Sequence, residues 1–329
     1  MARNRLTTDV LKEGVLSSDK AILGRAITLV ESKAEIDRTQ ALELIQQVLP
    51  FTGKSFRLGI TGAPGVGKST FIDGFANFLL NKGKRIAILA IDPSSKISGG
   101  SILGDKTRME KLVGQPGVFI RPSPAGIELG GVGQSTLESI LLCEAAGYDF
   151  IIVETVGVGQ SETVVKEMTD MLMFLTIAGA GDDLQGIKRG IMEMIDLVII
   201  NKSDQIETNV LVKLKSSLSN ALHLFPFREN KPDVEVLHCS ALNSEGFEAI
   251  FGFILKFHER ILSNGSFDEN RSNQRISWMN RTFVRMIENY IYKNDGLNAH
   301  LKNYEGLVRD NKLNPLEAAR QIFGLLKLQ

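Results

Sequence analysis

The run at residues 62–70 has the composition and spacing of a phosphate-binding loop. It consists of Gly62, Ala63, Pro64, Gly65, Val66, Gly67, Lys68, Ser69 and Thr70, and it contains a complete G-x-x-x-x-G-K-S pattern. The glycines let backbone N–H groups turn toward phosphate oxygens, and the amphipathic stretch that follows is expected to add the positive end of a helix dipole. Lys68 would reach the β- and γ-phosphates, and the Ser69 hydroxyl would ligate Mg²⁺. The pattern therefore predicts nucleotide binding.

A second pattern indicates which base is bound. Asn201, Lys202, Ser203 and Asp204 directly follow an apolar run. A carboxylate at Asp204 accepts hydrogen bonds from the ring N–H and the 2-amino group of guanine, whereas adenine would leave a buried acid unpaired. Ser240, Ala241 and Leu242 follow the next apolar run along the chain. They match a loop that, in guanine-nucleotide sites, supports the base with a backbone N–H. GTP and GDP are therefore the predicted ligands.

Acidic side chains at strand ends supply candidate ligands for Mg²⁺. Asp92 and Glu154 each end an apolar run, and Asp105 lies in a glycine-rich loop. These three acids and Ser69 are the predicted Mg²⁺ ligands. The same three acids and Lys68 are the predicted catalytic residues. Asp105 has a second interpretation as a helix N-cap.

The elements that must position these residues are predicted by short apolar runs. The runs are 56–61, 85–91, 118–121, 150–153, 171–177, 197–200 and 234–239. They do not alternate with polar residues, and amphipathic stretches separate them, which is typical of a parallel sheet covered by helices on both faces. We therefore predict an α/β fold of the P-loop NTPase type.

Helical patterns are predicted on both sides of this core. The predicted regions are a helical extension over 1–50, a GTPase domain over 51–265 and a helical arm over 266–329. The arm is expected to open with a polar linker at 266–274. Beyond it, Trp278, Phe283, Met286, Ile287 and Ile291 repeat at helical spacing, and we interpret them as a stripe that faces the core.

Composition excludes several classes of protein. Lys and Arg balance Asp and Glu at 38 each, so there is no general positive field for nucleic acid or an anionic membrane. No stretch approaches the ~20 apolar residues of a membrane span, and the N-terminus lacks the pattern of an export signal. The two cysteines are too few for a disulfide framework. We expect a cytoplasmic protein.

Six segments together resemble the MeaB/MMAA family, the methylmalonyl-CoA-mutase-associated GTPases of the SIMIBI class, once labelled ArgK-like kinases. They are GAPGVGKST (62–70), AIDPSS (90–95), GGSILGDKTRM (99–109), ETVGVGQSE (154–162), AGAGDDLQGIKRGI (178–191) and NKSD (201–204). The matches extend over most of residues 50–260.

The resemblance implies more than the residues do alone. It implies a homodimeric GTP hydrolase that binds an adenosylcobalamin-dependent acyl-CoA mutase, gates cofactor loading and protects the mutase. It places Glu154 in switch II and assigns Asp92 and Asp105 to switch I. It also implies a third switch in which Asp182, Gln185 and Lys188 signal to the partner.

Three alternatives remain open. A small-molecule kinase of the arginine or ornithine type would need an acceptor pocket beside the γ-phosphate, and no acceptor pattern is recognisable. A nickel-insertion GTPase commonly carries a His-rich or Cys/His segment, whereas the four histidines here are scattered. The nucleotide of a pure scaffold would serve only to stabilise the fold.

Overall fold

The computed structural model describes residues 5–92, 112, 114–124, 129–155, 161–179, 189–225 and 232–325. The chain divides into two compact units, residues 1–274 and residues 275–329. The division falls within one helix, α12 (Ser266–Lys293).

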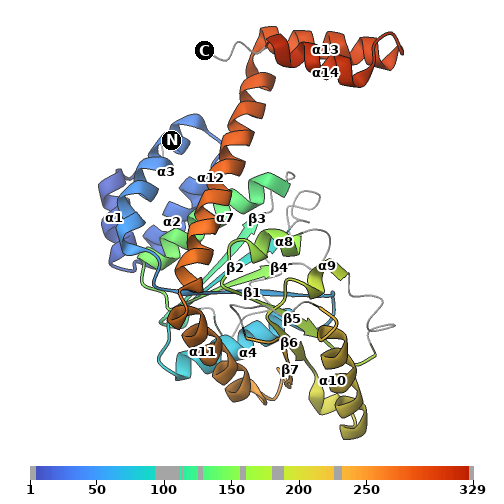
Figure 1. The fold of residues 1–329 in the computed structure, drawn as a ribbon. Coiled ribbons are helices and arrows are strands. Elements are labelled where there is room, and N and C mark those ends of the chain that lie inside the picture. Colours follow the sequence, from blue (N-terminus) through green and yellow to red (C-terminus); the bar gives the residue numbers. More distant parts are fainter. Residues whose placement is uncertain are drawn as a thin grey trace. The chain divides into compact units, whose positions relative to one another are not determined.

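A parallel sheet of seven strands forms the centre of the first unit (Figure 1). The strands are β1 (Phe56–Gly62), β2 (Ile86–Asp92), β3 (Val118–Pro124), β4 (Phe150–Thr155), β5 (Met171–Thr176), β6 (Leu197–Ile200) and β7 (Glu235–His238). Their order is β3-β2-β4-β1-β5-β6-β7, and every pairing is parallel. Each predicted apolar run forms a strand, so the predicted parallel sheet is confirmed.

Helices cover both faces of this sheet. They are α1 (Thr8–Leu16), α2 (Lys20–Glu31), α3 (Glu35–Val48), α4 (Lys68–Asn81), α7 (Leu129–Ala145), α8 (Ser161–Lys166), α9 (Arg189–Met192), α10 (Thr208–Leu222) and α11 (Phe247–Ser263), with short 3₁₀ helices η1 (Leu49–Phe51) and η2 (Ser203–Gln205). Among the helices that the structure describes, none is long and apolar enough to cross a bilayer.

Two hydrophobic cores lie on opposite sides of the sheet because successive side chains of a strand point to opposite faces. In β4, for example, Ile151 and Val153 contribute to one core, and Phe150 and Ile152 contribute to the other. The first core contains α1–α3 and α7, whereas the second contains α4 and α11 (Figure 1). With both faces buried, the strands need to be apolar throughout, as the sequence predicted.

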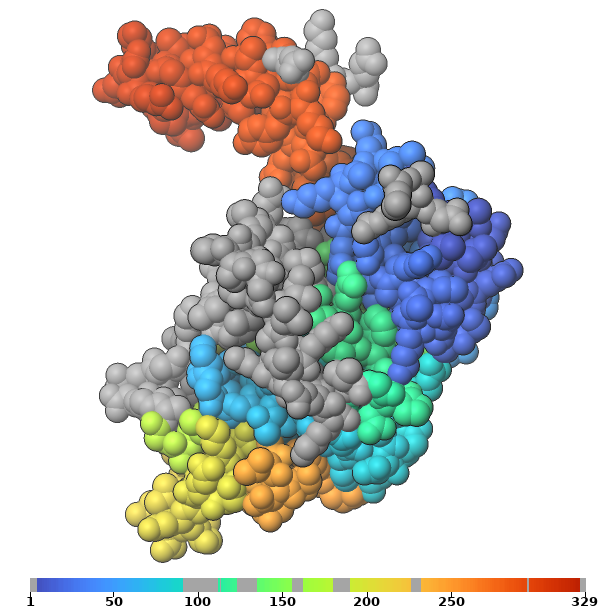
Figure 2. Space-filling view, turned by 180° about the vertical axis from the view of Figure 1, so that it is seen from behind, coloured from blue at the N-terminus to red at the C-terminus, as the bar shows by residue number. Residues whose placement is uncertain are grey.

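The N-terminal helices belong to the first unit. They share a core with α7, and the ion pair of Arg38 with the buried Glu138 joins α3 to α7. Figure 2 shows these helices, in blue, beside residues of the same unit drawn in green. Asp19 caps α2 by accepting hydrogen bonds from two backbone N–H groups of its first turn. The extension predicted over 1–50 therefore packs as a layer of the sheet domain.

The predicted polar linker at 266–274 is instead the beginning of α12. Its polar composition was misleading because Arg271 and Gln274 are buried, only 4% and 7% exposed, and form hydrogen bonds. Gln274, for instance, donates to the carbonyl of Thr169 at 2.8 Å. These residues fix the first turns of α12 to the sheet domain.

A buried network of four charges holds this part of α12. Arg271 donates to Asp170 through Nε (2.6 Å) and Nη2 (2.7 Å), and to Glu144 through Nη1 (2.9 Å). Arg57, in β1, donates to the same Glu144 oxygen at 2.8 Å. Burial alone would raise the pKa of Glu144, but the charges and hydrogen bonds of Arg57 and Arg271 hold it below its ordinary value. All four groups are at most 6% exposed, so each depends on the others.

The second unit contains the rest of α12 with α13 (Asp295–Arg309) and α14 (Pro315–Leu325). The apolar stripe that was predicted to face the core is exposed to solvent along part of its length. Phe283 is 62% exposed, Met286 is 65% exposed and Ile287 is 39% exposed. The interpretation as a stripe facing the core was therefore wrong for these three residues, because periodicity identifies an apolar face but not what covers it.

Replacing Arg271 is expected to destabilise the first unit strongly. Arg271→Ala leaves two buried carboxylates short of a partner, which predicts a loss of about 3–5 kcal/mol in the free energy of unfolding measured by urea denaturation. Lys82→Ala, which removes an exposed ion pair with Glu248, serves as the control and should cost about 1 kcal/mol or less. Equal effects of the two substitutions would contradict the assigned role of the network.

Candidate nucleotide site

The predicted nucleotide residues follow the carboxyl ends of four parallel strands. The loops after β1, β6 and β7 carry the phosphate pattern and the two base patterns, and Glu154 lies near the end of β4. In the pairing of β1 with β4, Ile60 lies opposite Glu154, two residues before the loop begins. Carboxyl ends of parallel strands meet at one edge of a sheet, which is where open α/β sheets bind their ligands.

The phosphate loop turns in a way that only glycine permits at two positions. At Gly62, a Cβ atom would lie 2.4 Å from the carbonyl oxygen of Leu175 in β5. Gly67 has a φ of +91°, and a Cβ there would lie 2.7 Å from Nδ2 of Asn201. α4 begins at the next residue, Lys68. The free N–H groups of its first turn therefore point toward the loop, as a phosphate site requires.

Lys68 is held inside the loop that it would use to bind phosphate. Its Nζ donates to the carbonyl oxygens of Gly62 (2.7 Å) and Ala63 (3.2 Å). Burial lowers the pKa of Lys68, and the negative charges of Glu154 and Glu162 partly offset that effect. The amine is thus a desolvated cation that donates to weak acceptors, and a phosphate oxygen is a stronger acceptor.

A hydroxyl and a carboxylate lie together beside this lysine. The Ser69 hydroxyl donates to Oε1 of Glu154 at 3.4 Å. Behind them, the Thr155 hydroxyl donates to the Thr61 hydroxyl at 2.9 Å, which joins the ends of β4 and β1. Hard oxygen ligands suit Mg²⁺, which takes few protein ligands in nucleotide sites, so the donor set fits. The described residues contain no group of three or more His, Cys, Asp or Glu able to hold a metal ion.

Asn201 joins the base loop to the phosphate loop. Its Nδ2 donates to the carbonyl of Val66 at 2.9 Å, and its Oδ1 accepts from the N–H of Ala241 at 3.1 Å. Lys202 adds a second link, because its Nζ donates to the carbonyl of Gly65 at 3.1 Å. The structure therefore brings three predicted segments together through one buried amide.

The residues predicted to contact the base lie at the surface of this junction. Asp204 is exposed, and Leu242 is 75% exposed. Ser240 is buried, and its backbone pairs with Glu245 in both directions to close the loop. A bound base could therefore contact the accessible carboxylate of Asp204 and the backbone of the loop that Ser240 and Glu245 close.

Five predicted site residues fall where the structure describes no side chain. Asp92 lies at the carboxyl end of β2, next to β4, and its side chain is outside the described atoms. Asp105, Asp182, Gln185 and Lys188 lie outside the described residues.

Sequence reasoning missed two features of the site. The first is the hydroxyl pair of Thr61 and Thr155, for which the signal was a threonine near the end of each of two apolar runs. The second is Cys239, whose thiol contacts Asn201. Its place directly before Ser240 was the available signal.

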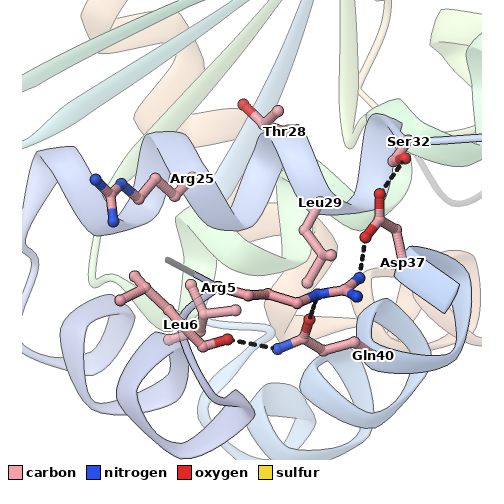
Figure 3. Close-up of a pocket in the computed structure, with 9 residues that line it drawn as sticks. Arg5, Leu6, Arg25, Thr28, Leu29, Ser32, Asp37 and Gln40 are labelled. Atoms are coloured by element: carbon pink, nitrogen blue, oxygen red, sulfur yellow. Dashed lines mark hydrogen bonds and ion pairs between the residues drawn. The ribbon is translucent and has the colours of Figure 1, made fainter. Parts of the chain in front are cut away.

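A cavity of about 950 Å³ lies elsewhere, among the helices α1–α3 (Figure 3). Arg5 reaches across it to an ion pair with Asp37 and donates to Gln40 at 3.0 Å. Gln40 in turn donates to the carbonyl of Leu6 at 2.8 Å. No predicted nucleotide residue lines this cavity, so it is separate from the candidate site.

Comparisons with known proteins identify the family of the chain. The family model described as "Methylmalonyl Co-A mutase-associated GTPase MeaB" matches residues 23–295. "GTPase ArgK" of Escherichia coli (strain K12) is 41% identical over 312 residues, which cover 94% of each chain. "Methylmalonic aciduria type A homolog, mitochondrial" of Mus musculus is 40% identical over 94% of this chain and 77% of its own length.

A solved structure is also similar. It is named "Crystal structure of LAO/AO transport system kinase" and is 33% identical, with a TM-score of 0.78, over 99% of this chain and all of its own length. The likeness covers both units and supports the fold described above.

The base preference is expected to depend on Asp204. Asp204→Asn replaces an acceptor by a donor, so GTP affinity should fall by about 100-fold while affinity for xanthosine triphosphate rises. Competition against a fluorescent guanine nucleotide measures both changes. Glu207→Gln, an exposed acid nearby, is the control and should change neither. Unchanged GTP affinity in Asp204→Asn would mean that this carboxylate does not contact the base.

Proposed function

The chain belongs to the MeaB family of methylmalonyl Co-A mutase-associated GTPases, and on this premise we propose that it serves an adenosylcobalamin-dependent acyl-CoA mutase as a G-protein chaperone. As a family member it is a GTP hydrolase; the proposal concerns what hydrolysis controls. We propose that it gates cofactor loading and protects the mutase from inactivation. The observation that carries the proposal is the family match over residues 23–295.

The hydrolytic roles follow from the positions of the side chains. Lys68 would exchange its carbonyl partners for the β- and γ-phosphates, and the N–H groups of the loop would surround the phosphate oxygens. Ser69 and Glu154, with Asp92 and Asp105, would hold Mg²⁺, which neutralises the developing charge. Glu154 would also orient the attacking water. Catalysis of this kind is mostly positioning and charge stabilisation, so slow turnover without a partner is expected.

Partner signalling is assigned to the segment that contains Asp182, Gln185 and Lys188. We propose that these residues respond to the mutase, because they match the third switch of the family. Their charged and amide groups could form new pairs when a partner binds. The proposal for Asp92 and Asp105 in switch I rests on the same resemblance.

We also propose that the chain is a homodimer formed through α12. Exposed apolar residues at positions 276, 279, 283, 286 and 290 are separated by steps of three, four, three and four. They are Ile276 (52% exposed), Met279 (62%), Phe283 (62%), Met286 (65%) and Tyr290 (63%). A repeat of this kind is typical of a coiled-coil seam, which a second α12 would cover.

A reducing, cytoplasmic compartment is proposed as the location. Cys143 and Cys239 are both free thiols buried in the sheet domain. Burial raises the pKa of both, so both stay protonated and unreactive at neutral pH.

A small-molecule kinase is the second candidate function. One observation favours it: the similar solved structure is named a "LAO/AO transport system kinase". The two functions differ in where the γ-phosphate goes, which is either to water or to the amino-acid acceptor.

Single-turnover hydrolysis of labelled GTP tests the proposed role. The rate should rise when a cobalamin-dependent mutase is added, because the partner completes the hydrolytic site. Lys68→Ala should abolish both hydrolysis and protection of the mutase, whereas Lys82→Ala, a change at the other end of α4, should alter neither. Equal rates with and without the mutase would contradict gating. Label transferred to arginine or ornithine would support the kinase instead, and protection retained by Lys68→Ala would indicate a scaffold.

The proposed dimer is tested by adding charge to α12. Phe283→Glu and Met286→Glu place a carboxylate in the seam, so sedimentation velocity should give the mass of one chain. Asn289→Glu adds the same charge to an exposed position of the same helix outside the repeat, and it should leave the dimer intact. A wild-type chain that sediments as a monomer, or seam variants that remain dimeric, would refute the seam.

A further inference from the structure

Cys239 contacts Asn201 within the candidate site, although none of the predicted nucleotide motifs includes it. It follows the last residue of β7 and precedes the loop that starts with Ser240. The thiol is free, and the residue is fully buried at 0% exposed. Cys143 is equally buried, but it lies in the opposite core, on α7.

The thiol of Cys239 contacts the amide that joins the loops. Its Sγ donates to Oδ1 of Asn201 at 3.4 Å, and the N–H of Ala241 donates to the same oxygen at 3.1 Å. Nδ2 of Asn201 is thereby left to donate to the carbonyl of Val66 at 2.9 Å. An amide rotated by 180° would turn its N–H groups toward two donors and its oxygen toward a carbonyl. The thiol therefore favours the orientation that binds the phosphate loop.

The surrounding backbone holds this thiol in place. The N–H of Cys239 donates to Ile200 at 2.9 Å, and its carbonyl accepts from Ser203 at 3.0 Å. Gly246 packs so closely that a Cβ would lie 2.4 Å from the carbonyl of His238 and 3.2 Å from Cβ of Cys239. The end of β6 with the loop after it, and the loop after β7, therefore hold Cys239 in a fixed position.

The thiol keeps its proton at neutral pH. Burial, with a smaller contribution from the negative charge of Asp204, raises the pKa of Cys239 to about 12. The S–H group can therefore act as a donor throughout the physiological range, and it is a poor target for oxidation or alkylation.

We propose that Cys239 is a positioning residue for guanine nucleotides, whose thiol orients Asn201 so that the base loop stays bound to the phosphate loop. The inference rests on the proposed nucleotide site. Without the thiol, the two loops separate more readily and the nucleotide dissociates faster. The chemical step on bound GTP should be unaffected, because the hydrogen bonds of Cys239 go to Asn201, Ile200 and Ser203, and the phosphate-binding amine belongs to Lys68.

The test compares nucleotide release with hydrolysis in the full-length chain. Both Cys239→Ala and Cys239→Ser remove the sulfur atom, but only serine keeps a hydrogen-bond donor. Comparing the two variants therefore separates the loss of the donor from the loss of side-chain volume. Release of a fluorescent GDP should be about 3- to 10-fold faster in Cys239→Ala, within about twofold of wild type in Cys239→Ser, and unchanged in Cys143→Ala. The single-turnover hydrolysis rate at saturating GTP should stay within about twofold in all three. Cys239→Val, which retains bulk without a donor, replaces the alanine variant if that variant does not fold.

A double-mutant cycle separates the two proposals. Asn201→Ala alone should release GDP rapidly, and adding Cys239→Ala to it should give no further change, because the thiol acts through Asn201. Additive effects, or equally fast release from Cys239→Ala and Cys239→Ser, would overturn the positioning role. Wild-type release from Asn201→Ala would instead mean that the proposed nucleotide site is wrong.

Discussion

One side-chain amide connects the two halves of the candidate nucleotide site. Asn201 donates to the carbonyl of Val66 in the phosphate loop and accepts from the backbone of Ala241 in the loop after β7. The residue is buried, at 1% exposed, so neither bond competes freely with water. Gly67 must lack a side chain to let the amide approach. In the proposed nucleotide site, this contact sets the spacing between the phosphate loop and the base loops.

The parallel sheet carries the candidate nucleotide site at one end of its strands and the charge network that anchors α12 at the other. Its carboxyl edge carries the phosphate loop, Glu154 and both base loops. At its amino edge, Arg57 near the start of β1 and Asp170 just before β5 join the charge network that fixes the first turns of α12. β1 therefore begins at the anchor and ends at the phosphate loop. Both edges belong to the same rigid layer of buried strands.

The parts of the fold that follow from local pattern were predictable from the sequence. Apolar runs identified every strand in the described part of the chain, and two short motifs identified loops that the structure brings together. The charge network was not predictable, because Arg57 and Arg271 are far apart in the chain and nothing local pairs them. The polar run before Gln274 was misread for the same reason. Phe283 and Met286 were misread because an apolar stripe does not reveal what covers it.

A crystal structure of the chain with GDP and Mg²⁺ tests the central claim most directly, which is that one amide holds the phosphate and base subsites in register. We expect Nζ of Lys68 to leave the carbonyls of Gly62 and Ala63 for the β-phosphate, and Asp204 to accept from the guanine edge. The bond from Asn201 to Val66 should persist. A nucleotide bound away from this edge, or an Asn201 amide released from Val66 with GDP in place, would contradict the claim.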